Sequence, residues 1–517
     1  MLRNNRRAAP TPFERPRRGV PAIALGLTLA AALAGCMSLA PAYRRPAAPV
    51  PDTFARTSCE AGPPLRAAER DSAAATAKPP GAADPGNCDA HLGWRDYFAD
   101  ADLRAVIEQA LANNRDLRIA AQRVEAARAN YGIRRADQWP SLDATATALR
   151  TRVPGGFVSP DASVKGLYNV GLAELGWEAD FWGRVRSLKA AALENFLASE
   201  AAQRAVTLSL IADVANAYLA LRALDERIAL ARATLDTRRD ALRIFRRRYE
   251  EGAISRLDMK QSEILLHQAE TLAAQLDQAR DAQQHALDLL LGAPSSPAHA
   301  PTRLDDDAVQ ARLAPGLPSD LLVHRPDVIA AEHRLRAANA DIGAARAAFF
   351  PRITLTSTLG TVSPALGDLF AAGSATWSFV PRITLPIFEG GRLHANLDLA
   401  HARRNEAVAQ YEKTVQSAFR DVADALSARA WLTEQVAIQR DTLAAQSERA
   451  RLAKLRYDNG AAPFLEVLDA QRDLLNAQQQ LVQMRQGLLS SRIALYAALG
   501  GDAEDGAPSL TPTRTRP

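Results

Sequence analysis

The sequence has few cysteines and no recognisable catalytic motif, and each of these absences excludes a class of function. Three cysteines occur in 517 residues, and their spacing resembles no metal site. The eight histidines are scattered, without the paired spacing of a metal-binding helix. Neither a Ser/His/Asp nucleophile elbow nor a glycine-rich phosphate loop is present. We therefore expect a protein that is not an enzyme and that holds no metal or cofactor.

An excess of one charge is also missing beyond residue 35. The formal net charge is +5, but residues 1–35 alone hold six arginines and one glutamate. The remaining 57 basic and 57 acidic side chains cancel. A basic surface for nucleic acid is not supported, so we expect no nucleic-acid partner.

Residues 1–35 have the order of an export signal. Arginines come first, an apolar run follows from Ala22 to Ala34, and small residues end it. The run is too short to span a bilayer, which needs about 20 apolar residues. It closes on Leu-Ala-Gly before Cys36, which resembles a bacterial lipoprotein cleavage box, so Cys36 is expected to carry S-diacylglycerol and N-acyl chains. An ordinary signal with an incidental cysteine is the alternative.

The segment that follows, residues 36–90, is rich in Pro and Ala. Cys59 and Cys88 lie in it, and an exported protein meets an oxidising compartment, so a disulfide between them is a candidate. We expect residues 37–90 and the polar tail 501–517 to be poorly ordered.

The most informative feature is an internal repeat. At an offset of 211 residues, Asn114 aligns with Arg325, and Pro140 with Pro351. Farther along the offset becomes 208 and several punctuating residues align: Gly183 with Gly391, Tyr249 with Tyr457, Gly252 with Gly460, and Gly292 with Gly500. We place repeat 1 at 91–300 and repeat 2 at 301–500.

Each repeat ends in a stretch typical of a long helical hairpin. Residues 184–291 contain no proline, and residues 391–499 contain one. Apolar side chains recur at a spacing of three to four, as Val206, Leu210 and Val214 do. A helix over 184–248 would be about 98 Å long at 1.5 Å per residue, so it needs lateral partners along its whole length. Shorter helices are expected at 103–138 and 327–349, each ending before a proline.

Between these helices lie segments that read as strands. We predict strands at about 141–153 and 166–180 in repeat 1, and at about 352–362 and 376–388 in repeat 2. A tilted strand of about 10 residues crosses a bilayer. Twelve of the 29 aromatic residues lie in 139–182 and 349–388, as expected for an interfacial girdle. The alternative is a soluble sheet with an aromatic core. In a membrane, four strands leave open edges, so several protomers must share one barrel.

Two segments resemble the outer membrane factor family of the TolC/OprM type. They are Leu-Pro-Ser-Asp-Leu-Leu-Val-His-Arg-Pro-Asp-Val-Ile-Ala-Ala-Glu at 317–332 and Ala-Ala-Arg-Ala-Ala-Phe-Phe-Pro-Arg-Ile at 344–353. A third, Trp-Arg-Asp-Tyr-Phe-Ala-Asp at 94–100, is similar to the opening motif of the lipoprotein branch that serves resistance–nodulation–division multidrug pumps. The resemblance covers about 36–500.

The resemblance implies an α+β membrane protein. Its trimer would share a 12-stranded transmembrane β-barrel, with four strands per protomer, continuous with a long periplasmic α-helical barrel. The implied function is the outer-membrane channel of a tripartite efflux pump, passively conducting drugs or other small toxic compounds to the exterior. The implied partners are two further copies, a periplasmic adaptor and an inner-membrane resistance–nodulation–division transporter. The alternative is an exit duct for type I protein secretion or metal-ion efflux.

At the hairpin tips, 248–258 and 456–466, the resemblance implies closure of the pore and contact with the adaptor. The residues expected to contact the adaptor are Gly252, Arg256, Leu257, Gly460, Pro463 and Leu465. Asp258 and Tyr457 are expected to form a hydrogen-bonded lock between helices, and Arg485 falls where a further lock residue sits. Glu466 and Asp469 would place six carboxylates around the trimer's aperture, which would favour cations.

A periplasmic adaptor is the rival class, because it too is found as a lipoprotein with a helical hairpin. An adaptor has one hairpin inserted in a small lipoyl-like domain. Two hairpins, each preceded by two strands of bilayer length, favour the channel.

Overall fold

The computed structural model describes residues 39–51, 54, 92–153, 163–294, 303–310, 313 and 321–501. The chain divides into two compact units. The first comprises Met1–Tyr43, Tyr131–Ala192 and Ala338–Arg403, and the second comprises Arg44–Asn130, Leu193–Ala337 and Arg404–Pro517. Each unit takes segments from both sequence repeats, so the repeats combine within a unit and do not form one unit each.

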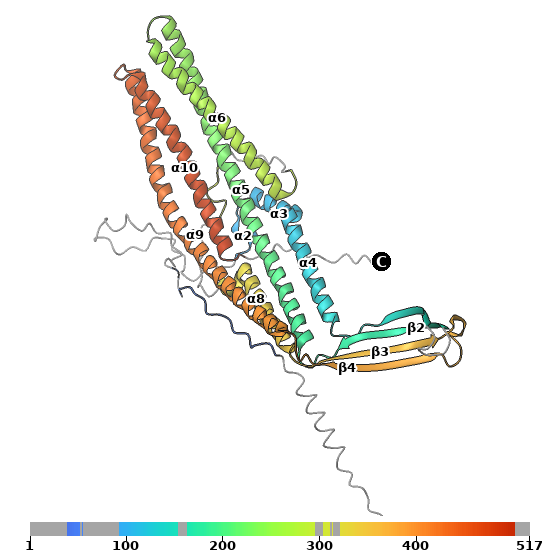
Figure 1. Ribbon diagram of the computed structural model, residues 1–517. Helices are drawn as coiled ribbons and strands as arrows, with labels where there is room; N and C mark the ends of the chain where they lie inside the picture. The colour runs from blue at the N-terminus through green and yellow to red at the C-terminus, as the bar shows by residue number, and fades with distance from the viewer. Residues whose placement is uncertain are drawn as a thin grey trace, which may run out of the picture. The chain divides into compact units, whose positions relative to one another are not determined.

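The first unit contains an antiparallel sheet of four strands, two from each repeat (Figure 1). Its strands are β1 (Asp143–Val153), β2 (Ser163–Glu178), β3 (Arg352–Ser363) and β4 (Ala375–Thr384), paired in that order. The predicted four strands per protomer are confirmed. Within the described chain, β1 and β4 are edge strands with one neighbour each.

The register of the sheet separates an apolar face from a polar one. Leu172, Leu359 and Trp377 are direct cross-strand partners and form a row on one face. Their exposed fractions in the single chain are 45%, 64% and 75%, so the described part of the chain leaves this face uncovered. The neighbouring row, on the opposite face, contains Gly171 and Gly360, whose backbones approach so closely that a Cβ on Gly171 would lie 2.5 Å from the Leu359 oxygen.

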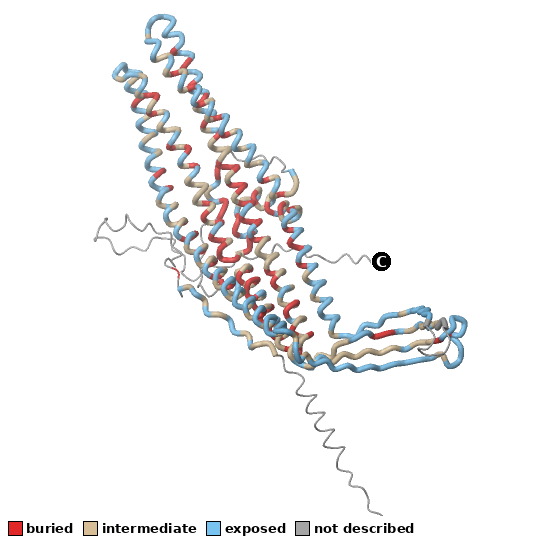
Figure 2. The backbone as a smooth tube through the Cα atoms, in the orientation of Figure 1, coloured by how far each residue is buried: buried red, intermediate tan, exposed pale blue. Residues whose placement is uncertain are grey.

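Two long helical hairpins supply most of the second unit. Hairpin 1 consists of α5 (Arg184–Glu250) and α6 (Arg256–Leu291), and hairpin 2 of α9 (Arg392–Asp458) and α10 (Phe464–Ala498). Both α5 and α9 contain 67 residues and they start 208 residues apart, as the repeat requires. Buried positions run along these helices, whereas much of the sheet is exposed (Figure 2). The long hairpins of the predicted fold class are confirmed.

Helix α5 contains an apolar window long enough to cross a membrane by length and composition. In the described part of the chain it is the one helix with such a window, and 56% of that window is buried inside the protein. The window is therefore explained by packing against neighbouring helices.

The helix predicted at 103–138 is interrupted, so that prediction is wrong in one respect. The structure has α3 (Ala101–Asn113) and α4 (Arg115–Ala136), separated at Asn114. The Asn114 side chain accepts a hydrogen bond from the Leu117 amide at 2.9 Å and donates one to the Leu290 carbonyl at 2.8 Å. The break could not be recognised from the sequence, because an asparagine that caps a second helix looks like any other polar residue within a polar segment. In repeat 2, α8 spans Pro326–Ala347 and follows the short α7 (Leu321–His324).

An aromatic core surrounds the short helix α2 (Trp94–Tyr97). Trp94, Tyr97 and Phe98 are fully buried. The Tyr97 ring stacks on Tyr496 at 4.5 Å between centroids. A β-bridge joins Phe98 to Val309, which brings the described segment 303–310 of the inter-repeat connection against α2.

The segment after Cys36 is more ordered than we expected. In the first unit, Asn339 donates a 2.7 Å hydrogen bond to the Pro41 carbonyl. In the second unit, Arg45 pairs with the buried Glu332 at 2.6 Å, and Phe54 is also buried there, stacked on Phe419. Poor order over all of 37–90 was therefore wrong for 39–51 and 54, because a composition rich in Pro and Ala does not reveal contacts with distant helices. The predicted residues Cys36, Cys59 and Cys88 and the tail 502–517 lie outside the described residues.

Candidate functional site

The two hairpin tips are built alike around one glycine each. Gly252 has φ +74° and Gly460 has φ +70°, and a Cβ at either would meet no atom within 4 Å. The glycines are needed for the left-handed backbone conformation, not for space. This explains why the repeat keeps a glycine at both tips.

The helices that leave the tips start differently in the two repeats. In hairpin 1, Ser255 and Asp258 form a capping box, in which the Ser255 hydroxyl accepts from the Asp258 amide and donates to its carboxylate at 2.7 Å. In hairpin 2, Pro463 stands at the capping position and provides no side-chain cap. The residue equivalent to Asp258 is Glu466, whose carboxylate is therefore free of a cap and accepts a 2.7 Å hydrogen bond from Arg456.

A second arginine joins the two hairpins near the tips. Arg248, in the last turn of α5, donates to the Tyr457 hydroxyl at 2.5 Å. One turn before it, Phe245 packs on Phe464 with 4.2 Å between ring centroids. Tyr457 also contacts Phe464 at 5.0 Å. The tip of hairpin 2 is thus held against α5 by one polar and one aromatic contact.

The predicted hydrogen bond between Asp258 and Tyr457 is wrong within the chain. The bonds of the Asp258 carboxylate go to the backbone amide and hydroxyl of Ser255, and the Tyr457 hydroxyl is bound by Arg248. The capping box competes for the carboxylate that the lock would need. Sequence reasoning missed Arg248 and Arg456, although the duplicated Arg-Tyr pair at 248–249 and 456–457 was a signal for them.

The acidic positions expected at the aperture have arginine partners in the structure. Glu466 pairs with Arg456 at 2.7 Å, and Asp469 pairs with Arg472 at 3.2 Å. Glu466 and Asp469 lie three residues apart in the first turns of α10. The negative charge predicted for this ring is therefore reduced but not removed by neighbouring guanidinium groups, because Arg472 is shared between Asp469 and Asp473. These pairs are exposed in the chain and add little to its stability.

Arg485 does not lie at the tip, which corrects its predicted place in the lock. It follows Phe464 by 21 residues on α10, a distance of about 30 Å along the helix axis. Its guanidinium pairs with Asp306 at 2.7 Å and with Glu226 at 3.1 Å, and it also donates to the Leu304 carbonyl. Arg485 thereby fastens the inter-repeat segment 304–306 to α5 and α10.

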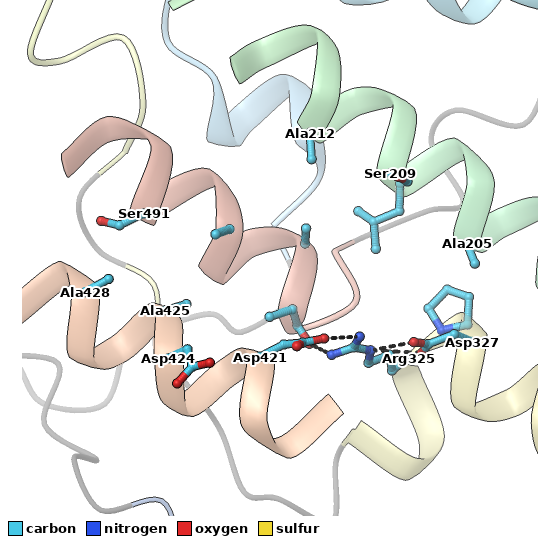
Figure 3. A pocket seen from close by; sticks show the side chains of 15 residues that line it. Ala205, Ser209, Ala212, Arg325, Asp327, Asp421, Asp424, Ala425, Ala428 and Ser491 are labelled. Atoms are coloured by element: carbon cyan, nitrogen blue, oxygen red, sulfur yellow. Dashed lines mark hydrogen bonds and ion pairs between the residues drawn. The ribbon is translucent and has the colours of Figure 1, made fainter. Parts of the chain in front are cut away.

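The Arg-Pro-Asp of the 317–332 segment forms a half-buried ion-pair node (Figure 3). Arg325 contacts Asp421 of α9 at 2.8 Å and Asp327 at 2.9 Å, and donates to the Ala498 carbonyl at 3.2 Å. Burial alone would lower the pKa of Arg325, but Asp327 and Asp421 raise it overall. The node lines one end of a cavity of about 560 Å³.

The same contact recurs in repeat 1 with a neutral residue. Asn114, the equivalent of Arg325, donates to the carbonyl of Leu290, which is the equivalent of Ala498. Both contacts place the start of a shorter helix, α4 or α8, against the last turn of a hairpin. The segment that carries the family resemblance therefore has a structural role, away from the tips.

Among the described residues no group of three or more His, Cys, Asp or Glu side chains is arranged to hold a metal ion.

The comparisons with known proteins concern the family and the fold of the chain. The sequence model of the family "Outer membrane efflux protein" matches residues 106–293 and 317–501. The chain is 43% identical over 505 residues to outer membrane protein OprJ of Pseudomonas aeruginosa, covering 96% of this chain and 98% of that protein. It is 44% identical over 479 residues to the toluene efflux pump outer membrane protein TtgF of Pseudomonas putida, covering 92% and 96%.

Solved structures give the same result for the fold. A membrane protein from Pseudomonas aeruginosa matches with a TM-score of 0.80 and 41% identity, over 92% of this chain and all (100%) of that chain. The open state of the MtrE outer membrane channel of Neisseria gonorrhoeae matches with a TM-score of 0.78 and 37% identity, over 90% and 98%.

Proposed function

The chain belongs to the outer membrane efflux protein family, and from that premise we propose that its trimer passively conducts amphiphilic organic compounds, such as drugs and solvents, out of the cell. It is the outer-membrane channel component of an efflux pump and not an enzyme. The substrate class is inferred from the relatives, one of which is described as a toluene efflux component.

The observation that carries the proposal is the uncovered sheet. Its strands of 10 to 16 residues have the length of a bilayer crossing, one face exposes Leu359 and Trp377, and both edges lack a second neighbour in the described chain. In lipid, unpaired edges are too costly, so the sheet must close with other copies. Since the order β1 to β4 is antiparallel throughout, β4 of one copy fits β1 of the next, and three copies give a barrel of about 12 strands.

The proposed gate is the pair of hairpin tips. Arg248 and Tyr457 hold hairpin 2 against α5, and Arg456 holds Glu466 in the first turn of α10. These contacts are few and exposed, so a partner that binds the tips shifts the population towards an open arrangement without large cost. Gly252, Arg256, Leu257, Gly460, Pro463 and Leu465 form the proposed docking surface for the adaptor. Leu257 and Leu465 are exposed by 66% and 47%, as a docking surface requires.

The remaining partners are a periplasmic adaptor and an inner-membrane resistance–nodulation–division transporter, which supplies the energy. Acylation of Cys36 would anchor the N-terminus in the outer membrane. Because the barrel itself is embedded in lipid, Cys36→Ser should yield unacylated protein that still inserts.

A complementation assay tests the function. Cells that lack their own outer-membrane channel would receive this chain together with one adaptor and one transporter of the multidrug class. Restored resistance to drugs and organic solvents supports the proposal. If the chain restores only export of a protein through a type I secretion system, or only metal-ion resistance, the substrate class proposed here is wrong.

A further inference from the structure

A charged residue interrupts the apolar stripe of α5. Five apolar side chains of this stripe are buried at alternating spacings of three and four: Ile228, Ala231, Leu235, Leu242 and Phe245. Arg238 occupies the position between Leu235 and Leu242 and is only 4% exposed. A stripe with this spacing normally contains apolar residues throughout, so Arg238 requires an explanation.

Arg238 has no partner among the described residues. Its Nη1 atom is buried without a hydrogen bond, and no ion pair in the described chain includes this side chain. Burial lowers the pKa of Arg238, and the positive charge of Arg472 lowers it further. A buried guanidinium without an acceptor destabilises the structure that contains it.

The stripe of α5 that carries Arg238 lies between α6 and the second hairpin, because its Leu235 and Leu242 cluster with Leu266 and Ala269 of α6. Two contacts give the antiparallel register between α5 and α10: Arg227 bonds Gln479 at 2.7 Å, and Phe245 packs on Phe464. Arg238 lies between these contacts, which places it opposite α10 near residues 469–473.

The two carboxylates in that part of α10 are shared among arginines from more than one helix. Arg472 pairs with Asp469 and Asp473 at 3.2 Å each, and Asp473 is shared with Arg449 of α9 at 2.7 Å. Together with Arg238 these are three guanidinium groups against two carboxylates, both of which already have partners.

We propose that Arg238 and Arg472 form a binding site for a small inorganic anion, of the chloride class, between α5 and α10. The anion accepts hydrogen bonds from Arg238 and balances the surplus positive charge. It thereby holds hairpin 1 against hairpin 2 at a level 12 residues before the end of α5. Binding to the arrangement in which the hairpins are packed together stabilises that arrangement in proportion to ln(1+[L]/Kd). The site does not depend on which compounds the channel conducts.

The internal repeat supplies a matched neutral variant. The position of α9 equivalent to Arg238 is Gln446, in the corresponding stripe that includes the buried Val436, Gln439 and Ala453. A glutamine is therefore compatible with this stripe, so Arg238→Gln should fold. Arg243→Gln is the control, because Arg243 is an exposed arginine on the same helix and pairs with Asp240.

The experiment uses bromide as the probe on the full-length trimer. Crystals soaked in sodium bromide are tested for anomalous density between Arg238 and Arg472. In solution, hydrogen–deuterium exchange of residues 232–244 is compared in sodium bromide and sodium gluconate at equal ionic strength. We expect exchange to slow by about tenfold when bromide is at about ten times its Kd.

Bromide density at the two guanidinium groups, with protection that is lost in Arg238→Gln and kept in Arg243→Gln, supports the site. Equal exchange of the wild type in both salts overturns it, even if density is present, since the ion is then adventitious. A carboxylate of a neighbouring copy at Arg238 overturns it as well. Neither negative result bears on the channel assignment, which drug-resistance complementation tests separately.

Discussion

The Arg248 guanidinium donates a 2.5 Å hydrogen bond to the Tyr457 hydroxyl, and its carbon lies 6.0 Å from the centre of the tyrosine ring. The two residues are 209 positions apart and belong to different hairpins. Their repeat equivalents, Arg456 and Tyr249, do not form this pair: Arg456 binds Glu466 instead. The duplicated arginines therefore have different roles. Arg248 joins hairpin 1 to hairpin 2, whereas Arg456 stabilises the turn of its own hairpin.

We expect Tyr457→Phe and Arg248→Ala to raise the open probability of the channel. Each removes one hydrogen bond worth about 0.5–1.5 kcal/mol, which corresponds to a change of up to about tenfold in the population of the open arrangement. Single-channel recordings in planar bilayers measure it. Tyr249→Phe is the matched control, and Asp258→Asn should also leave the currents unchanged because Asp258 only caps α6. Equal currents in all four variants and the wild type would remove Arg248 and Tyr457 from the gate.

Glu466→Gln and Asp469→Asn should weaken block by divalent cations. The effect of each alone should be small, about 0.2–1 kcal/mol or less than tenfold in the blocking constant, because each carboxylate is exposed and already paired with an arginine. Arg456→Gln should act in the opposite direction, because it leaves the charge of Glu466 uncompensated. Titration of single-channel current with magnesium measures the blocking constant. If Arg456→Gln weakens block, Glu466 does not face the aperture.

Arg485→Met should lower the stability of the trimer and leave its conductance unchanged. Arg485 and Glu226 are both largely buried, with 15% and 13% of their side chains exposed. Removing one partner of such a pair costs about 3–5 kcal/mol, because the other charge remains buried. The midpoint of thermal unfolding, followed by circular dichroism, should fall. A leaky channel of unchanged stability would return Arg485 to the gate.

Asp421 should make stability depend on pH in the acid range. Burial raises the pKa of this carboxyl, but hydrogen bonds from Arg325 and Arg420 outweigh it and hold the pKa below its ordinary value. Its contribution is then fully present above the ordinary pKa of about 3.9 and is lost as pH falls through the lower, folded-state value.

Asp421→Asn should therefore unfold at a lower temperature than the wild type at pH 7, and the difference should shrink as the pH falls below about 4. The loss at neutral pH should be about 1.5–3 kcal/mol, the range for hydrogen bonds to charged groups. Asp424→Asn, at a side chain that is 77% exposed, should change little at any pH. A difference that persists unchanged at pH 2 would mean that Asp421 does not act through its charge.

The order of helices and strands could be predicted from the sequence because glycines, prolines and apolar spacing determine the ends and types of elements locally. The internal repeat then showed that the same order occurs twice. The prolines at 140 and 351 marked where strands begin after a helix, and the aligned glycines at 252 and 460 coincide with the two tips. Family resemblance supplied the trimer and the function. The break between α3 and α4 at Asn114 was not predicted, because it depends on a single side chain that caps the start of α4.

The ion pairs of the site could not be predicted from the sequence. Asp258 has a carboxylate that could accept a hydrogen bond from the Tyr457 hydroxyl, and it lies at a hairpin tip as the lock requires. In the structure, however, Ser255, three residues earlier, engages that carboxylate in a capping box. Arg485 lies on the correct helix for a lock but far from its tip. The partner of a long, flexible arginine depends on helix register, which neighbouring residues in the sequence do not specify.

The most direct test of the channel assignment is the conductance of the purified full-length trimer in planar bilayers, with and without millimolar magnesium. We predict a small, cation-preferring conductance that magnesium reduces and that grows when tip residues 249–255 and 457–463 are deleted. Properly trimerised protein that stays silent both intact and after deletion of the tips would contradict a channel.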